Sequence, residues 1–141
     1  MRRAPLEPSL WYATAAPAPD LPALAEDIET DVCIVGAGYT GLSTALHLAP
    51  EGVRTVVLDA EEVGYGGSGR NAGHCTPTFH FYSIPRGRRM LGEPWAERLI
   101  QRQTNAANLV GRLIEEHGID CEWRQTGYLH AAHTPSALAK L

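Results

Sequence analysis

Gly36-Ala37-Gly38-Tyr39-Thr40-Gly41 is the stretch that decides the fold of this 141-residue chain. It follows the short apolar run 31–35 (DVCIV), whose length and β-branched content predict a buried strand. After it come residues 42–49 (LSTALHLA), whose apolar side chains recur at helical spacing. A second apolar run, 55–58 (TVVL), ends at Asp59. This order predicts a βαβ unit, and hence an α/β fold of the Rossmann-like type.

Each glycine of the turn has a physical role in such a unit. We expect Gly36 to allow the tight turn, Gly38 to let the backbone approach a pyrophosphate, and Gly41 to let the helix pack on the strand. The amides at the start of the helix, at the positive end of its dipole, favour an anion. Asp59 is suited to accept hydrogen bonds from an adenosine ribose 2′-hydroxyl, and its charge disfavours the 2′-phosphate of NADP. The pattern predicts a site for the ADP half of a dinucleotide; a glycine turn without a ligand is the alternative.

A second glycine-rich segment, 64–74 (GYGGSGRNAGH), follows the βαβ pattern. Five glycines in eleven residues suit a backbone that passes close to another group. The segment also carries hydroxyl, guanidinium, amide and imidazole groups that suit phosphates, ribityl hydroxyls or a ring edge, on Ser68, Arg70, Asn71 and His74. A flexible loop without a ligand is the alternative.

The ends of the chain show weaker patterns. Residues 1–30 hold five of the ten prolines, which predicts an extended N-terminal arm fixed to the surface by its apolar cluster 10–12 (LWY). A substrate-contacting role for Trp11 is the alternative. Residues 75–92 are expected to be irregular, with a solvated basic loop at Arg86, Arg88 and Arg89.

The C-terminal part predicts one long helix, 93–117, that begins near Pro94 and ends at Gly118. A strand over 127–132 and the start of a helix over 136–141 are expected to follow. Because nothing caps that last helix, the chain looks cut short. The residues expected on the buried face of the long helix are Leu99, Ala106, Val110, Leu113, Ile114 and His117.

Composition excludes several classes of protein. The net charge of −4 gives no electrostatic footprint for nucleic acid or an anionic membrane, and no apolar run approaches the roughly 18 residues of a membrane-spanning helix. Three distant cysteines without a C-x-x-C pair argue against a disulfide framework and against a zinc site, so no metal is expected. We expect Cys33 to be buried in its strand, and the protein to be cytoplasmic.

With these motifs identified, the sequence resembles the FAD-dependent oxidoreductases of the D-amino-acid oxidase-like family, in the branch that contains the gamma-glutamylputrescine oxidoreductases. The resemblance lies in the segments 10–12, 31–43, 68–73 and 93–117, and in Gly127-Tyr128-Leu129. It implies FAD as the cofactor. The residues that it implies in contact with FAD are Gly36, Ala37, Gly38, Tyr39, Thr40, Gly41, Asp59, Ser68, Gly69, Arg70, Asn71, Gly73 and His74.

Three features depart from that family's pattern. Asp59 stands where the family usually has a glutamate, which keeps the chemistry on a shorter side chain. Residues 72–74 (AGH) replace the usual Gly-Gly-Gln, and His74 or Cys75 is of a residue type through which some relatives attach flavin covalently. Complete members are several times longer, so this chain resembles an N-terminal fragment with a truncated fold.

The resemblance implies the N-terminal part of an enzyme that oxidises the C–N bond of a small amine or amino acid by hydride transfer to flavin. It divides the chain into the arm 1–30, an FAD-binding segment 31–92 and an incomplete entry to a substrate domain, 93–141. No catalytic residue is assigned, and a second chain is a possible source of the missing C-terminal half. The alternatives are a non-catalytic truncated remnant and a small NAD-binding module, which would leave residues 68–73 unexplained.

Overall fold

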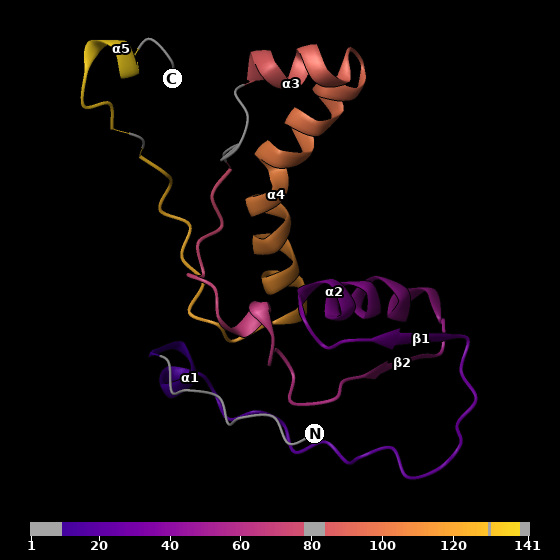
Figure 1. Ribbon diagram of the computed structural model, residues 1–141. Helices are drawn as coiled ribbons and strands as arrows, with labels where there is room; N and C mark the ends of the chain where they lie inside the picture. The colour runs from indigo at the N-terminus through magenta and orange to yellow at the C-terminus, as the bar shows by residue number, and fades with distance from the viewer. Residues whose placement is uncertain (1–9, 78–83, 130, 139–141) are drawn as a thin grey trace. The chain divides into compact units, whose positions relative to one another are not determined.

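The computed structural model describes residues 10–77, 84–129 and 131–138 (Figure 1). The chain divides into two compact units, residues 1–72 and 73–141. The boundaries expected at residues 30 and 92 separate functional parts of the sequence, and they stay predictions. No helix within the described residues has both the length and the apolar character needed to cross a bilayer.

The first unit is built on a strand–helix–strand element. Strand β1 (Val32–Val35) leads through the glycine turn into helix α2 (Tyr39–Leu48), and a 3₁₀ turn η1 (Ala49–Glu51) precedes strand β2 (Thr55–Leu58). The two strands are parallel neighbours, with Val35 opposite Leu58, and α2 packs along them (Figure 1). The predicted α/β character is therefore confirmed as a small parallel sheet with a helix. The helix begins at Tyr39, three residues before the expected start.

The sheet has one covered face and one open face. On the covered face, Ile34 lies against Gly41 of α2. On the opposite face Val35 is 87% exposed, and Cys33 is also exposed. The prediction that Cys33 is buried is wrong, because the continuous apolar run of β1 has a covering element on only one side within the described residues.

The N-terminal arm contains a short helix that the proline content did not predict. Helix α1 (Leu10–Thr14) lies between the prolines rather than across them, so the arm is not extended throughout. All five of its residues are exposed. The arm is fixed by a hydrogen bond, in which Tyr12 Oη donates to Glu62 Oε2 at 2.6 Å, rather than by burial of the apolar cluster 10–12.

The second unit is helical. Helix α3 (Ile84–Leu91) packs against helix α4 (Trp95–His117), and Arg88 of α3 pairs with Glu93 at 3.3 Å and with Glu97 at 3.4 Å. The prediction of an irregular loop is therefore wrong for 84–91, which form a helix that packs against α4, whereas Arg86, Arg88 and Arg89 are exposed as predicted. The part of that loop at 78–83 lies outside the described residues.

Helix α4 turns inward only part of the face that its large apolar residues predicted. Its buried residues are Ala96, which is 2% exposed, and Gly111, whose backbone lies against the ring of Trp123. From the predicted face, Leu99 and Val110 are 45% and 36% exposed, whereas Leu113 and Ile114 are partly buried. Small residues allow the close approach that decides which face is buried, and hydrophobicity alone does not detect this.

The end of α4 agrees with its sequence signal, whereas the last predicted strand does not form. Gly118 ends the helix in the left-handed conformation, with φ of +59°, as expected. The described residues of 127–132 form no strand, and Leu129 is 90% exposed. A strand requires a hydrogen-bonded neighbour, and the described sheet contains β1 and β2 alone. Helix α5 (Pro135–Leu138) begins as expected; residues 130 and 139–141 lie outside the described ones.

Candidate cofactor site

The glycine turn between β1 and α2 has the geometry that its sequence predicted. Gly36 has φ of +106°, a conformation that side chains other than glycine rarely adopt. A Cβ on Gly41 would collide with the carbonyl oxygen of Gly36 and would lie 3.2 Å from Ile34 Cγ2. The two glycines therefore allow the tight turn and the close packing of α2 on β1.

The second glycine-rich segment lies directly against this turn. Tyr39 N, the first amide of α2, donates to Ser68 Oγ at 3.0 Å, and Gly64 N donates to Ala37 O at 2.9 Å. A Cβ on Gly38 would lie 2.7 Å from Ser68 Oγ, so a side chain there would displace this hydroxyl from Tyr39 N. The structure thus brings together the two segments that the sequence singled out.

Asn71 fixes the far end of the second segment. Its Nδ2 donates to Ser68 O at 2.7 Å and to Tyr39 Oη at 3.2 Å. The segment includes a 3₁₀ turn, η2 (Gly67–Gly69), and a Cβ on Gly69 would collide with the carbonyl oxygen of Gly64. The composition of this segment therefore reflects a folded loop rather than a flexible one.

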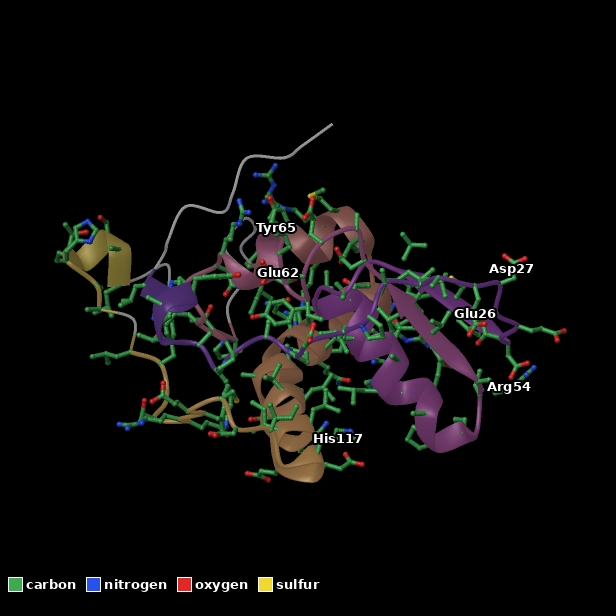
Figure 2. All side chains as sticks on the ribbon, turned by 90° about the horizontal axis from the view of Figure 1, so that it is seen from below. Glu26, Asp27, Arg54, Glu62, Tyr65 and His117 are labelled. Atoms are coloured by element: carbon green, nitrogen blue, oxygen red, sulfur yellow. The ribbon has the colours of Figure 1, made fainter. Side chains whose placement is uncertain are left out.

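Arg70 is held by an aromatic ring that sequence reasoning did not assign to the site. Its guanidinium lies over the ring of Tyr65, 5.0 Å from the centroid, which is a cation–π geometry. Tyr65 and Glu62 both lie in the connection after β2 (Figure 2). The position of Tyr65 inside the glycine-rich segment, beside residues that the sequence singled out, is the signal that could have identified it.

Asp59 reaches back to the glycine turn. Its Oδ2 accepts a hydrogen bond from Ala37 N at 2.7 Å, and its Oδ1 accepts one from Glu61 N at 3.0 Å. These two bonds fix the orientation of the carboxylate. The side chain is therefore held at the edge of the site, and its contact with a ribose stays a prediction.

The start of α2 offers backbone donors to an anion. The N–H groups of Gly38, Thr40 and Gly41 have no hydrogen-bond partner among the described residues, whereas Tyr39 N is capped by Ser68. The ordinary helix ladder begins with Leu42 N donating to Gly38 O at 2.9 Å. These unpaired amides belong to a glycine turn that has little room for added side chains, and they fit the pyrophosphate of a dinucleotide.

Two predicted contact residues belong to the second unit. Gly73 has φ of +69° and His74 is exposed. Because they lie beyond the boundary between the units, their contact with a cofactor stays a prediction.

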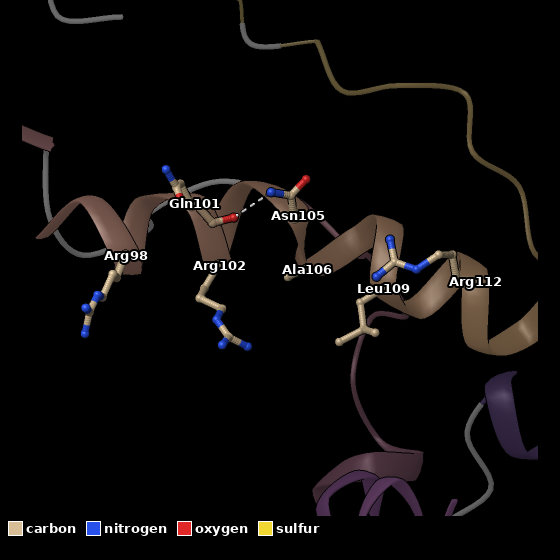
Figure 3. A pocket seen from close by; sticks show the side chains of 7 residues that line it. All are labelled: Arg98, Gln101, Arg102, Asn105, Ala106, Leu109 and Arg112. Carbon is tan, nitrogen blue, oxygen red and sulfur yellow. Dashed lines mark hydrogen bonds between the residues drawn. The ribbon is translucent and has the colours of Figure 1, made fainter. Parts of the chain in front are cut away.

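Helix α4 carries the hollow shown in Figure 3, of about 620 Å³. None of its lining residues was predicted to belong to a site, and all of them lie on α4. Among the residues that the structure describes, no acidic side chain lines it; the lining residues are Arg98, Gln101, Arg102, Asn105, Ala106, Leu109 and Arg112.

Comparison with known proteins identifies the family. Residues 31–141 match the family described as FAD dependent oxidoreductase. This chain belongs to that family. FAD is accordingly its cofactor type, and the paired glycine-rich segments are its candidate cofactor site. No solved structure matches this chain significantly.

The curated relatives that this chain matches are much longer than the chain itself. It is 37% identical to gamma-glutamylputrescine oxidoreductase of Escherichia coli over 94% of its own length and 31% of the relative's. It is 36% identical to the probable oxidoreductase OrdL of Rhizobium meliloti over 95% of the chain and 31% of the relative. It is 34% identical to the putative Rieske iron-sulfur protein YhfW of Bacillus subtilis over 89% of the chain and 25% of the relative. The chain therefore spans about a third or less of the length of these relatives.

Proposed function

We propose that this chain provides the FAD-binding portion of an oxidoreductase that oxidises the C–N bond of a small amine or amino acid. The observation that carries the proposal is the pairing of the glycine turn with the second glycine-rich segment through Tyr39 N and Ser68 Oγ. A glycine turn alone serves many nucleotides, whereas a second built segment beside it suits the larger FAD molecule. The name of the Escherichia coli relative supports an amine as the substrate.

The residues of the site divide the work of binding. The unpaired amides of Gly38, Thr40 and Gly41 would hold the pyrophosphate, and Asp59 would hold the adenosine ribose. Arg70, whose guanidinium lies over the ring of Tyr65, would add a cation to the site. Bound flavin would supply the hydride acceptor for C–N oxidation.

The Rossmann-like classification forms part of the same proposal. It is supported by the parallel pair β1–β2 with α2 as the crossover, by the turn conformation of Gly36, and by the close packing of Gly41 on the turn. A cytoplasmic location is also proposed, since the three cysteines are free and exposed. The chain covers only 25–31% of its relatives, so the proposal concerns the cofactor-binding portion of such an enzyme.

The test is to incubate the purified chain with FAD, pass it through gel filtration and record the visible absorption spectrum. We expect a flavin spectrum that comigrates with the protein, and loss of that spectrum in Asp59→Ala combined with Ser68→Ala. Precipitation with acid then separates bound flavin from flavin attached covalently to His74 or Cys75. Added amines would be tested for bleaching of the flavin band.

Each alternative predicts a different result. A small NAD-binding module would bind NAD more tightly than FAD, which titration of intrinsic fluorescence with both nucleotides would show. A non-catalytic remnant would bind FAD weakly and would leave the flavin band unbleached by any amine. A colourless protein under conditions where its circular dichroism shows folded helix would refute the proposal.

A further inference from the structure

Arg70 carries a cation that is held in place without being neutralised. Its guanidinium lies over the ring of Tyr65, 5.0 Å from the centroid, and the side chain is exposed. Among the residues that the structure describes, no carboxylate pairs with this guanidinium and no oxygen accepts its N–H groups. The partner that the structure gives the cation is therefore a neutral ring, and the positive charge stays available to an anion.

A ring partner leaves the hydrogen-bond donors of an arginine unoccupied. An aromatic ring attracts a cation through its face, whereas the five N–H groups of a guanidinium lie in the plane of that group. A carboxylate partner would instead occupy two of these N–H groups and cancel the charge. The ring of Tyr65 also limits the conformations of a long side chain, which lowers the entropy that Arg70 loses when it binds a ligand.

An anion site lies beside this segment of the chain. Ser68, two residues before Arg70, accepts a hydrogen bond from Tyr39 N at the start of α2, at 3.0 Å. The neighbouring amides of that helix end have no partner among the described residues and fit the pyrophosphate of a dinucleotide. All of these residues, with Tyr65, belong to the first unit. A free guanidinium two residues from the capping hydroxyl suits the same anion as the amides.

We propose that Tyr65 is a positioning residue that holds the Arg70 guanidinium in readiness for the pyrophosphate of the cofactor. In the bound state, Arg70 donates N–H groups to phosphate oxygens while the ring of Tyr65 remains against the guanidinium. Tyr65 thus acts through Arg70 and needs no contact of its own with the cofactor. This inference deepens the proposed function and rests on it, since it assigns a role at the same site.

Tyr65 is half-buried, so a purely structural role in its loop is the alternative that an experiment has to separate. Variants of the full chain are titrated by calorimetry with FAD and, separately, with ADP, which carries a pyrophosphate and no flavin. Tyr65→Leu removes the ring and should raise the Kd for both nucleotides by about two- to fivefold. Tyr65→Phe keeps the ring and should bind both as the unaltered chain does. Circular dichroism checks that each variant folds.

Two substitutions of Arg70 show whether Tyr65 acts through it. Arg70→Ala should raise the Kd for both nucleotides by about tenfold or more, because it removes a hydrogen bond to a charged group. Adding Tyr65→Leu to Arg70→Ala should raise the Kd no further, since residues that act as one unit are not additive. Arg70→Lys keeps the charge but loses the planar group, so it should bind about as weakly as Tyr65→Leu. Because Arg70 is exposed, this variant keeps the test decisive even if Tyr65→Leu does not fold.

The chain contains a matched control in its second unit. Arg98 lies over the ring of Trp95 at 4.9 Å, which is the same kind of pair at nearly the same separation. Neither residue belongs to the candidate cofactor site. Trp95→Leu should therefore leave the Kd for FAD and for ADP unchanged.

Several outcomes would overturn the inference. Wild-type affinity in Tyr65→Leu or in Arg70→Lys would show that orientation of the guanidinium does not matter. A loss in the double variant that is the sum of the two single losses would make Tyr65 structural. A loss for FAD without one for ADP would remove Arg70 from the pyrophosphate. Binding of ADP but not FAD, with the predicted order of variants, would refute the proposed function and leave this inference standing; a chain that binds neither nucleotide would refute both.

Discussion

Replacing Gly41 by alanine should destabilise the first unit, although alanine is the better helix former. The new Cβ would collide with the carbonyl oxygen of Gly36 and would lie 3.2 Å from Ile34 Cγ2. Because the nearest atom belongs to the backbone, only a movement of α2 away from β1 relieves the collision. Overpacking costs up to about 3 kcal/mol and the gain in helix propensity returns about 1 kcal/mol, so we expect a net loss of about 2 kcal/mol.

Gly87→Ala is the matched control for this prediction. Gly87 lies inside α3, and a Cβ added there meets no atom within 4 Å. The same substitution should therefore stabilise α3 by about 0.5–1 kcal/mol, because alanine restricts the unfolded chain more than glycine does. Both variants replace glycine with alanine, and they differ in the space that is available to the new methyl group.

The assay is urea unfolding followed by circular dichroism, together with amide hydrogen exchange of β1 and α2 to report the first unit separately. Titration with FAD gives a second readout, since a displaced α2 no longer presents its amides to the pyrophosphate. We expect faster exchange in β1 and α2 and weaker FAD binding in Gly41→Ala alone. Equal stability of the two variants would refute the packing role assigned to Gly41.

Three further predictions concern polar contacts. Ser68→Ala removes the hydroxyl that caps α2 and should cost about 1 kcal/mol in urea unfolding, whereas Ser68→Thr should keep most of it. Hydrogen bonds from Arg54 hold the pKa of Asp31 below its ordinary 3.8, so this contact stabilises the fold above that pH and is lost as the pH falls through the lower folded value. Asp31→Asn should therefore flatten the acid limb of a series of urea midpoints, and an unchanged limb would contradict the assignment. The hydrogen bond to Glu62 raises the pKa of Tyr12 above 10.0, so its contribution is complete below that pH and disappears as the pH rises through the folded value. Glu62→Gln should return one tyrosine to ordinary titration in an ultraviolet difference spectrum.

The features that were predicted correctly depend on contacts between residues close in sequence. The glycine pattern at 36–41 specified a turn between a strand and a helix, and Gly118 specified the end of α4. Local signals of this kind fail where contacts with another segment decide whether a helix forms. Arg88 lies in a helix that packs against α4 and pairs with Glu93 and Glu97, which its own segment does not reveal.

The candidate site was predictable in its residue types and only partly in its geometry. Ser68 and Asn71 were singled out for possible contact with a cofactor, and within the structure they bond to Tyr39 N and Tyr39 Oη. Tyr65 was not singled out at all, although it orients Arg70. Composition shows which groups are available, whereas it contains no information on which of them meet.

By itself, therefore, the sequence determined the order strand, glycine turn, helix and strand, the acid after β2, and the family to which they belong. Only the tertiary structure decided that Ser68 caps a helix 29 residues away, that Asp59 turns back to Ala37, and that Val35 is left uncovered. The physical reason is the range of the interactions. Propensity and backbone conformation act within a turn or two of the chain, whereas capping across segments and burial of a sheet face depend on what the folded chain brings alongside.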